Sequence, residues 1–361
     1  MNDKVTLMKG NEALAMAMIR YGADGYFGYP ITPQSEVLEK LEEEMPWDTT
    51  GMVVLQAESE VAAINMVYGG AMTGKAVCTS TSSPGFSLMQ EGVSYLAASE
   101  VPALLINVQR GGPGLGTIHA SQADYFQACK GGGHGDYHMI VLAPSSVQEM
   151  ADMVALGFDL AFKYRCVSMI LADGTIGQLM EKVVLPEQRP RRTDEEIRQQ
   201  CPWAVNGRKG MRPSNVVTSL ELDDDKMEEN NHRFQACYRE IEKNETRCEL
   251  VDVENCDYLI TAFGTTARIA MKAMELAREE GIKVGLFRPI TLWPFPANEL
   301  REAAKNVKGI LNVELNAGQM VEDVKLAVEC KMPVEHYGRF GGNVPTPDEL
   351  LQVLKDKLIN K

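Results

Sequence analysis

The chain has 361 residues, of which 45% are hydrophobic and 24% charged, and its formal net charge is −14. This acidic balance argues against nucleic acid or an anionic membrane as the main partner. No apolar run approaches the roughly 18 residues of a membrane span, and the N-terminal residues contain no secretion signal, so we expect a cytoplasmic protein. The length exceeds what one hydrophobic core usually serves, so two domains are expected.

Eight cysteines are spread along the chain, and no two of them form a Cys-x-x-Cys pair. Zinc sites and iron–sulfur clusters usually need such close pairs, so we expect no metal site held by this chain alone. Without a secretion signal, the thiols are expected to be reduced and mostly buried.

Short apolar runs alternate with helical segments through the first half of the chain. This alternation predicts an α/β fold with a parallel sheet that helices cover on both faces. The expected strands are residues 25–29, 52–56, 75–80, 103–108, 138–142 and 166–171, and the expected helices are residues 11–21, 35–44, 60–72, 86–98, 124–129 and 146–163.

The pattern changes after residue 186, where Pro, Asn, Gly and blocks of charge become frequent. We interpret residues 187–254 as an extended connector with one helix near residues 231–242. A second, smaller alternating block follows, and the expected domains are therefore residues 1–186 and 255–361. The expected strands of the second block are residues 258–262, 283–287 and 309–314, with a short strand later. Its expected helices are residues 264–280, 297–304, 320–329 and 348–358.

The first candidate site is Glu60, at the start of an expected helix. Ser59 suits the N-cap, and a carboxylate in the first turn suits the helix dipole. A lone Glu at this position is more often an ordinary charged residue in the first turn of a helix. However, the helix behind it carries small residues that would let another subunit come close, namely Ala62, Ala63, Gly69, Gly70 and Ala71. A half-buried carboxylate at such a contact is a candidate catalytic group.

Two glycine-containing segments are weaker signals. Residues 111–116 are Gly-rich, but they lack the following helix that a dinucleotide motif needs. Phe263-Gly264-Thr265-Thr266 could bind an anion at a helix N-terminus, although a plain strand-to-helix turn is the commoner meaning.

Four motifs occur in an order that points to one family. They are Tyr29-Pro30-Ile31-Thr32-Pro33; Glu58-Ser59-Glu60 followed by Gly69; Pro84-Gly85-Phe86-Ser87-Leu88-Met89-Gln90-Glu91; and Gln109-Arg110-Gly111-Gly112-Pro113. Together they resemble the α subunit of the thiamine-diphosphate-dependent 2-oxoacid:ferredoxin oxidoreductases. The resemblance covers nearly the whole chain: the first block is similar to the pyrimidine-binding domain of the family, and the last to its transketolase-C-terminal-like domain.

Within that family, two segments resemble the branched-chain members, which act on 2-oxoisovalerate (3-methyl-2-oxobutanoate). They are Gly111-Gly112-Pro113-Gly114-Leu115-Gly116 and Lys130-Gly131-Gly132-Gly133-His134-Gly135-Asp136-Tyr137. The 2-oxoglutarate members carry Ser-Thr-Gly after the Gly-Gly-Pro. This departure makes 2-oxoglutarate the alternative substrate.

The resemblance implies a role for each candidate residue. Glu60 would hydrogen-bond N1′ of the cofactor's aminopyrimidine and so promote loss of the thiazolium C2 proton, and Ile31 would contact the cofactor. Arg110 would bind the substrate carboxylate, which a guanidinium suits in a bidentate manner, and Thr32 would reach the substrate. His119 and His134 flank the same region, and their roles stay open.

The resemblance also implies partners, because the family's Mg²⁺-binding Gly-Asp-Gly motif has no good match here. The nearest runs are Ala23-Asp24-Gly25 and Ala172-Asp173-Gly174. A β subunit would supply Mg²⁺ and the diphosphate site, and γ and ferredoxin-like subunits would serve coenzyme A and the iron–sulfur clusters. The reaction would turn a 2-oxo acid and coenzyme A into acyl-CoA, CO₂ and reduced ferredoxin. A non-catalytic scaffold subunit and a stand-alone transketolase-type enzyme are the alternatives.

Overall fold

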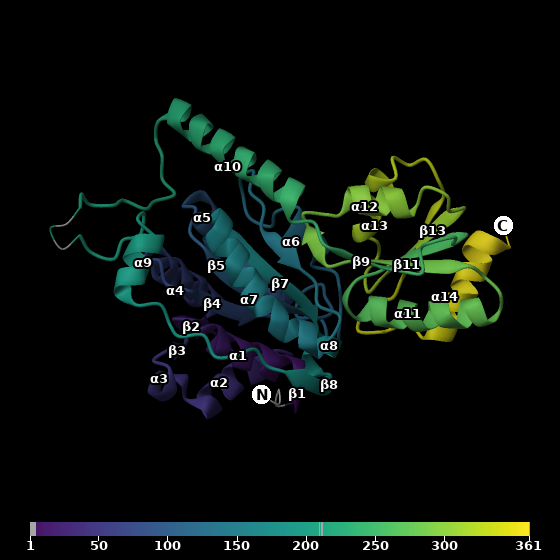
Figure 1. The fold of residues 1–361 in the computed structure, drawn as a ribbon, viewed down its shortest axis with the longest axis horizontal. Coiled ribbons are helices and arrows are strands. Elements are labelled where there is room, and N and C mark those ends of the chain that lie inside the picture. Colours follow the sequence, from purple (N-terminus) through teal and green to yellow (C-terminus); the bar gives the residue numbers. More distant parts are fainter. Residues whose placement is uncertain (1–4, 209, 211, 361) are drawn as a thin grey trace.

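The computed structural model describes residues 5–208, 210 and 212–360, and the larger of its two main sheets has seven strands. The strand order is β12-β6-β7-β5-β4-β2-β3, and every pairing is parallel except that of β12 with β6 (Figure 1). The expected parallel sheet is therefore confirmed. Its strands are β2 (Gly25–Gly28), β3 (Val53–Gln56), β4 (Val77–Thr81), β5 (Ala103–Gln109), β6 (Ile140–Leu142), β7 (Val167–Asp173) and β12 (Thr291–Trp293).

Helices cover both faces of this sheet, as predicted. They are α1 (Gly10–Tyr21), α2 (Ser35–Glu44), α3 (Pro46–Thr49), α4 (Glu60–Met72), α5 (Ser83–Ala98), α6 (Tyr125–Cys129), α7 (Val147–Tyr164) and α8 (Gly174–Gln178). Gly157 of α7 lies against the side chain of Leu104, whereas Gly70 of α4 lies against Val77. Because Leu104 pairs with the residue after Val77, the two side chains point to opposite faces. Helices α4 and α7 therefore cover different sides.

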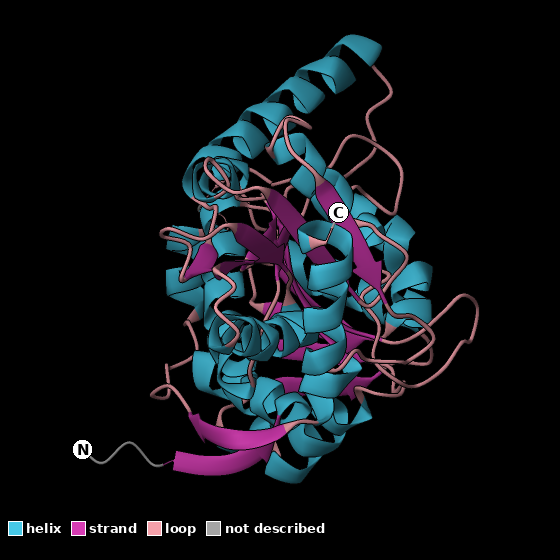
Figure 2. Ribbon diagram, turned by 90° about the vertical axis from the view of Figure 1, so that its right-hand side faces the viewer, coloured by secondary structure: helices cyan, strands magenta, loops and turns pink. Residues whose placement is uncertain are grey.

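An antiparallel strand pair that the sequence analysis did not predict lies beside this sheet. It joins β1 (Val5–Lys9) to β8 (Met180–Val184) at the lower end of the molecule (Figure 2). Both strands are short and mostly exposed, so their sequences lack the apolar runs that marked the buried strands. The pair ties the two ends of the first block together.

The connector is more ordered than predicted. It contains α9 (Asp194–Gln200), α10 (Asp224–Asn244) and β9 (Cys248–Val251), and α10 runs across the top of the first block (Figure 1). Helix α10 starts earlier than expected because the side chain of Asp223 caps it by accepting from the backbone N–H of Lys226. Strand β9 pairs with the second sheet, so that sheet begins inside the predicted connector. The domain limits at 186 and 254 stay predictions.

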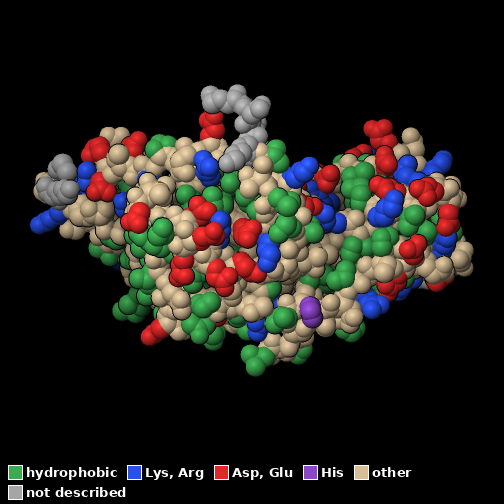
Figure 3. Space-filling view, turned by 90° about the horizontal axis from the view of Figure 1, so that it is seen from below, with side chains coloured by type: hydrophobic (Ala, Val, Ile, Leu, Met, Phe, Trp, Pro, Cys, Tyr) green, Lys and Arg blue, Asp and Glu red, His purple; other side chains and the backbone are tan. Residues whose placement is uncertain are grey.

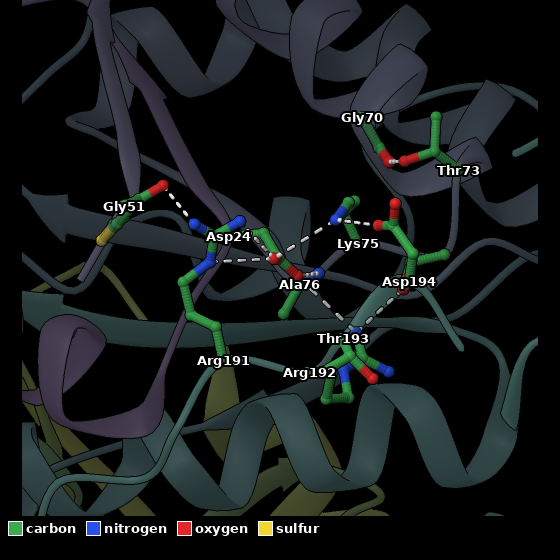
Figure 4. Close-up of polar contacts among 12 residues, drawn as sticks. Asp24, Gly51, Gly70, Thr73, Lys75, Ala76, Arg191, Arg192, Thr193 and Asp194 are labelled. Atoms are coloured by element: carbon green, nitrogen blue, oxygen red, sulfur yellow. Dashed lines mark hydrogen bonds and ion pairs between the residues drawn. The ribbon is translucent and has the colours of Figure 1, made fainter. Parts of the chain in front are cut away.

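Asp24, at the start of β2, anchors the connector to the first block (Figure 4). Its Oδ1 accepts from Nε and Nη2 of Arg191 at 3.1 and 2.8 Å, and its Oδ2 accepts from the backbone N–H of Ala76 at 2.8 Å. Lys75 Nζ lies 3.8 Å from the same carboxylate, whose side chain is only 3% exposed. Nη2 of Arg192 lies 3.9 Å from it as well. A buried anion among three cations should hold this segment firmly, since removing the anion would leave these cations without a counter-charge.

We therefore expect Asp24→Ala to lower the free energy of unfolding by about 2–3 kcal/mol. Asp159→Ala is the matched control, because Asp159 also pairs with a connector arginine, Arg189, at 3.2 Å, but both side chains are about half exposed. The control should lose less than about 1 kcal/mol. Urea unfolding followed by circular dichroism measures both, and equal losses would show that Asp24 is no anchor.

The second sheet has five strands in the order β14-β13-β10-β11-β9, parallel except at β9. Its remaining strands are β10 (Tyr258–Thr261), β11 (Val284–Pro289), β13 (Gly309–Glu314) and β14 (Val334–Gly338). Its helices are α11 (Gly264–Glu279), α12 (Ala297–Ala303), α13 (Met320–Ala327) and α14 (Pro347–Leu354), with a π-helical turn at Lys355–Ile359. This smaller α/β block agrees with the predicted second domain.

Buried polar contacts dock the second block onto the first. Gln122 donates through Nε2 to the carbonyl of Phe263 at 2.7 Å and accepts the backbone N–H of Leu315 at 3.0 Å. Asp173 accepts from the backbone and hydroxyl of Thr265 at 3.1 and 2.6 Å. The helix N-terminus at Thr265 thus does bind an anion, the carboxylate of Asp173. Strand β12 of the second block also completes the first sheet.

The surface and the thiols agree with the composition. Seen from below, acidic side chains gather on the part of the first block where α2 lies (Figure 3), and α2 carries Glu36, Glu39, Glu42, Glu43 and Glu44. All eight cysteines are free, and Cys78, Cys129, Cys166, Cys201 and Cys256 are buried. Most of the thiols are therefore buried, as predicted, and burial raises the pKa of each of these five.

Candidate functional site

The predicted site residues come together at one edge of the seven-stranded sheet. Thr32 follows β2, Glu60 follows β3 and Arg110 follows β5, so all three follow the carboxyl ends of parallel strands in this sheet. Ligands of open α/β sheets usually bind outside that edge. The fold itself therefore gathers residues that are up to 78 positions apart in the chain.

Glu60 is buried, with 6% of its surface exposed, and begins α4 as predicted. The hydroxyl of Ser59 caps the helix by accepting from the backbone N–H of Ala62 at 3.2 Å. A Cβ placed on Gly85 would come within 2.6 Å of Glu60 Oε1, so only glycine leaves this carboxylate room. Among the described residues, no hydrogen bond to the Glu60 carboxylate is found. Glu58, in contrast, points into solvent.

Three hydroxyls in or directly after β4 are buried without a hydrogen-bond partner in the described part of the chain: those of Thr79, Thr81 and Ser82. The hydroxyl of Thr81 lies near Glu60, because both border the Cβ position of Gly85. Buried polar atoms are nearly always paired, so an unpaired group beside a buried carboxylate is typical of a ligand site. Thr81, Ser82 and Gly85 were not among the predicted site residues. The signal for the two hydroxyls is a Ser/Thr-rich run that ends the buried strand β4 and leads into α5.

Arg110 is 9% exposed, and its guanidinium braces the surrounding loops. Nη1 donates to the carbonyl of Thr32 at 2.9 Å, and Nη2 donates to the carbonyl of Leu115 at 3.1 Å. Nε is buried and has no partner among the described residues. Only two of the five N–H donors of a guanidinium are therefore used, and an anion can accept from the others.

A small polar network fixes the backbone of Arg110. Its N–H donates to the hydroxyl of Ser83 at 3.0 Å, and that hydroxyl lies 2.6 Å from Oδ2 of Asp124. Asn107 donates to the same oxygen at 2.9 Å. Burial raises the pKa of the Asp124 carboxyl, and the hydrogen bonds from Ser83 and Asn107 oppose that shift. This network had no signal in the sequence, because its members come from three separate segments.

Thr32 and His119 face the same cavity, whose volume is about 550 Å³. Ile31 is half-buried in the turn before it, where its carbonyl accepts from the backbone of Gln34 at 3.0 Å. His134 lies elsewhere, in a separate cavity of about 400 Å³ beside Tyr95 and Phe234. The cavity with Thr32 and His119 is lined by Thr32, Pro33, Glu36, Ile118, His119, Ala120, Gly174, Thr175, Gln178, Gly342 and Val344.

Neither aspartate of the two Asp-Gly runs is free to bind a cation. Asp24 is held by Arg191 and Ala76, and Asp173 by Thr265 and the backbone of α8. Across residues 5–208, 210 and 212–360, no group of three or more His, Cys, Asp or Glu side chains could hold a metal ion.

Two family profiles together match most of the chain. Residues 16–247 match the thiamine-diphosphate-binding region of the pyruvate flavodoxin/ferredoxin oxidoreductases, and residues 256–350 match core domain II of pyruvate:ferredoxin oxidoreductase. The two matched regions meet within the connector, close to the start of the second sheet. The profiles therefore agree with the family that the four motifs indicated.

Full-length relatives give the same result. The chain is 47% identical to the ketoisovalerate oxidoreductase subunit VorB of Methanothermobacter marburgensis, over 97% of both chains. It is 33% identical to the 2-oxoglutarate synthase subunit KorA of Archaeoglobus fulgidus, over 98% of this chain and 100% of that one.

A solved structure shows the same fold. The 2-oxoglutarate:ferredoxin oxidoreductase of Magnetococcus marinus superposes with a TM-score of 0.81 at 26% identity, over 98% of this chain and 65% of that chain. A split-gene transketolase superposes with a TM-score of 0.60 at 13% identity, which shows a shared fold alone. The chain therefore belongs to the thiamine-diphosphate-dependent 2-oxoacid:ferredoxin oxidoreductases, and it is more similar to the ketoisovalerate subunit of Methanothermobacter marburgensis than to the 2-oxoglutarate subunit of Archaeoglobus fulgidus.

Proposed function

We propose that this chain is the α subunit of an enzyme that oxidatively decarboxylates a branched-chain 2-oxo acid, 2-oxoisovalerate. The products would be acyl-CoA, CO₂ and reduced ferredoxin. The observation that carries the proposal is the buried, unpaired carboxylate of Glu60 on the same sheet edge as the partly unused guanidinium of Arg110. The 47% identity to a ketoisovalerate oxidoreductase subunit supports the choice of substrate.

The residues present fit the aminopyrimidine end of thiamine diphosphate. Glu60 would accept and hold a proton at N1′ of that ring, because the carboxylate is buried and has no donor from the described residues. Gly85 leaves space beside it, and the free hydroxyls of Thr81 and Ser82 would hydrogen-bond the ring. When bound, this cofactor supplies the electron sink that decarboxylation of a 2-oxo acid needs. Ile31 would contact it from the opposite turn.

Arg110 and Thr32 would orient the substrate. The unused Nε and Nη donors of Arg110 would bind the C1 carboxylate, and the carbonyl of Thr32 fixes the guanidinium in place. Thr32 lines the cavity, and its hydroxyl would reach the substrate. Burial of the guanidinium keeps competing water away, which strengthens each of these contacts.

The substrate's side chain would extend into the same cavity. None of the described residues that line it is Lys or Arg, and Glu36 adds a carboxylate. A branched aliphatic group is accepted there, whereas the second carboxylate of 2-oxoglutarate would be buried without a cationic partner. The resemblance to KorA subunits keeps 2-oxoglutarate as the alternative.

An apolar surface beside Glu60 supports a partner subunit. Val53 and Leu55 of β3 pair with Gly25 and Phe27, and the ring of Phe27 faces α4, so these side chains share the α4 side of the sheet. Edge strands with exposed apolar side chains are usually covered. The surface consists of Val53 (49% exposed), Leu55 (41%), Val61 (46%), Met66 (37%) and Leu88 (56%).

In our proposal the β subunit covers this surface and brings Mg²⁺ and the diphosphate site to Glu60. The γ and ferredoxin-like subunits would provide coenzyme A binding and iron–sulfur clusters, with ferredoxin as electron acceptor. No helix of the described residues is both long and apolar enough to cross a bilayer. We place the complex in the cytoplasm, without a nucleic-acid or membrane partner.

We expect the isolated chain to bind thiamine diphosphate weakly, because the Mg²⁺–diphosphate contacts would come from the partner. Titration calorimetry on the purified chain, with and without the β subunit, measures this. Affinity should rise strongly when the β subunit is added. Tight, Mg²⁺-dependent binding to the single chain would instead favour a stand-alone transketolase-type enzyme.

A further inference from the structure

A loop of the second block reaches the segment that carries Arg110. It follows β14 and includes Gly341 and Gly342, whose φ angles of +66° and +88° suit glycine. A Cβ on Gly342 would lie 2.6 Å from Cβ of His119, and one on Gly111 would lie 3.4 Å from the backbone nitrogen of Gly342. The two blocks therefore meet directly at the loop that follows Arg110.

The same loop forms one wall of the cavity that Thr32 faces. Val344 and Gly342 line it from the second block, next to Ile118 and His119 of the Arg110 loop. Val344 is half-buried, so part of its side chain is available to a ligand. Residues more than two hundred positions apart thus enclose one space.

Polar contacts flank the wall on both sides. Next to the loop, Nη1 of Arg339 pairs with Oε1 of Glu349 at 2.7 Å, and the hydroxyl of Tyr337 contacts the same carboxylate. On the other side, Gln122 fixes the end of the Arg110 segment to Phe263 and Leu315. A cavity whose lining segments are anchored beside it can select ligands by size, because close-packed side chains yield only at a cost.

We propose that the second block determines substrate specificity, with Val344 as the residue that measures the aliphatic side chain of the 2-oxo acid and Gly342 as the position that sets the cavity's width. The inference rests on the proposed function, since it assumes that this cavity takes the substrate's side chain. It gives the second block a role in the reaction besides support of the fold.

The test uses the assembled complex and kcat/KM for 2-oxoisovalerate, its longer relative 4-methyl-2-oxopentanoate, and pyruvate. Val344→Ala should raise the ratio of the longer to the shorter branched acid by about 10-fold, since a methylene in an apolar pocket has that order of effect. Val344→Phe should lower both branched acids relative to pyruvate. Val353→Ala, at a half-buried valine of α14 away from the cavity, is the matched control and should leave every ratio unchanged.

The outcomes separate this inference from the proposed function. Suppose that the wild-type complex turns over 2-oxo acids, and that the kcat/KM ratios among the three acids stay within twofold of wild type in both folded Val344 variants. This result would overturn the specificity role and leave the proposed function standing. Wild-type complex that turns over none of the three acids would overturn both. Gly342→Ala is an independent test. The added methyl group should displace His119, and we expect KM for the branched acids to rise by a larger factor than kcat falls.

Discussion

Glu60→Gln is expected to lower kcat of the assembled complex by about 10²–10⁴, because general acid–base help is commonly worth that much. A neutral amide cannot hold a proton at N1′ as a carboxylate does. The substitution preserves size, and the described residues make no hydrogen bond to the carboxylate, so the fold should be unaffected. Steady-state kinetics with a low-potential dye measure the loss, and circular dichroism checks the fold.

Glu58→Gln is the matched control, since Glu58 lies two residues earlier and points into solvent. We expect this variant to keep nearly full turnover. Equal losses in both variants would contradict the assignment of Glu60. An unchanged kcat in Glu60→Gln would favour the scaffold alternative, in which this chain only supports a catalytic partner.

The sequence predicted most of the fold because its sheets are buried on both faces. Strands such as β5 and β7 are buried along their whole length and mostly apolar, and the long helix between them, α7, has an amphipathic pattern. Glu60 was found for a related reason, since an N-cap serine and a first-turn carboxylate are local signals. Local signals of this kind can be read without any tertiary contact.

What the sequence could not predict depends on pairing between distant segments. Strand β12 is short and contributes to a sheet formed by the first half of the chain, and β9 joins the second sheet from inside the connector. Neither has a length or an alternation that distinguishes it from loop. The N-cap residues of α9 and α10, Thr193 and Asp223, could have predicted these helices. The blocks of charge around them instead favoured an extended connector.

The same distinction between local signals and tertiary contacts applies to the site. Residues that follow strands were predicted from motif and position, whereas the network of Ser83, Asn107 and Asp124 and the wall at Val344 arise only from the fold. His134 illustrates the opposite error. It is close to His119 in sequence, yet it lies in a different cavity, because α6 and the Gly-rich turn carry the chain to the other end of α5.

Arg110→Leu is expected to reduce kcat/KM by about 10²–10³-fold for 2-oxoisovalerate, 2-oxoglutarate and pyruvate alike. Truncating one partner of a buried charged pair usually costs about 2–5 kcal/mol, and the C1 carboxylate is common to all three acids. The ratios among the substrates should therefore stay nearly constant. The result would distinguish Arg110 from Val344. Variants of Val344 should change the ratios of kcat/KM among the substrates, whereas loss of Arg110 should lower kcat/KM for all of them.

The substitution also removes hydrogen bonds to Thr32 and Leu115, so a loss of activity alone could reflect a displaced loop. Arg110→Lys addresses this, because it keeps the charge but not the fork geometry and should recover part of the activity. Arg268→Leu is the matched control: Arg268 is also held by a polar contact, with Glu181 at 2.8 Å, but it is partly exposed and is not part of the cavity lining. A strong selective loss for one substrate in Arg110→Leu would show that Arg110 contacts the side chain and not the carboxylate.

A clear wild-type preference for 2-oxoglutarate would overturn the substrate assignment and leave the family and the role of Glu60 intact.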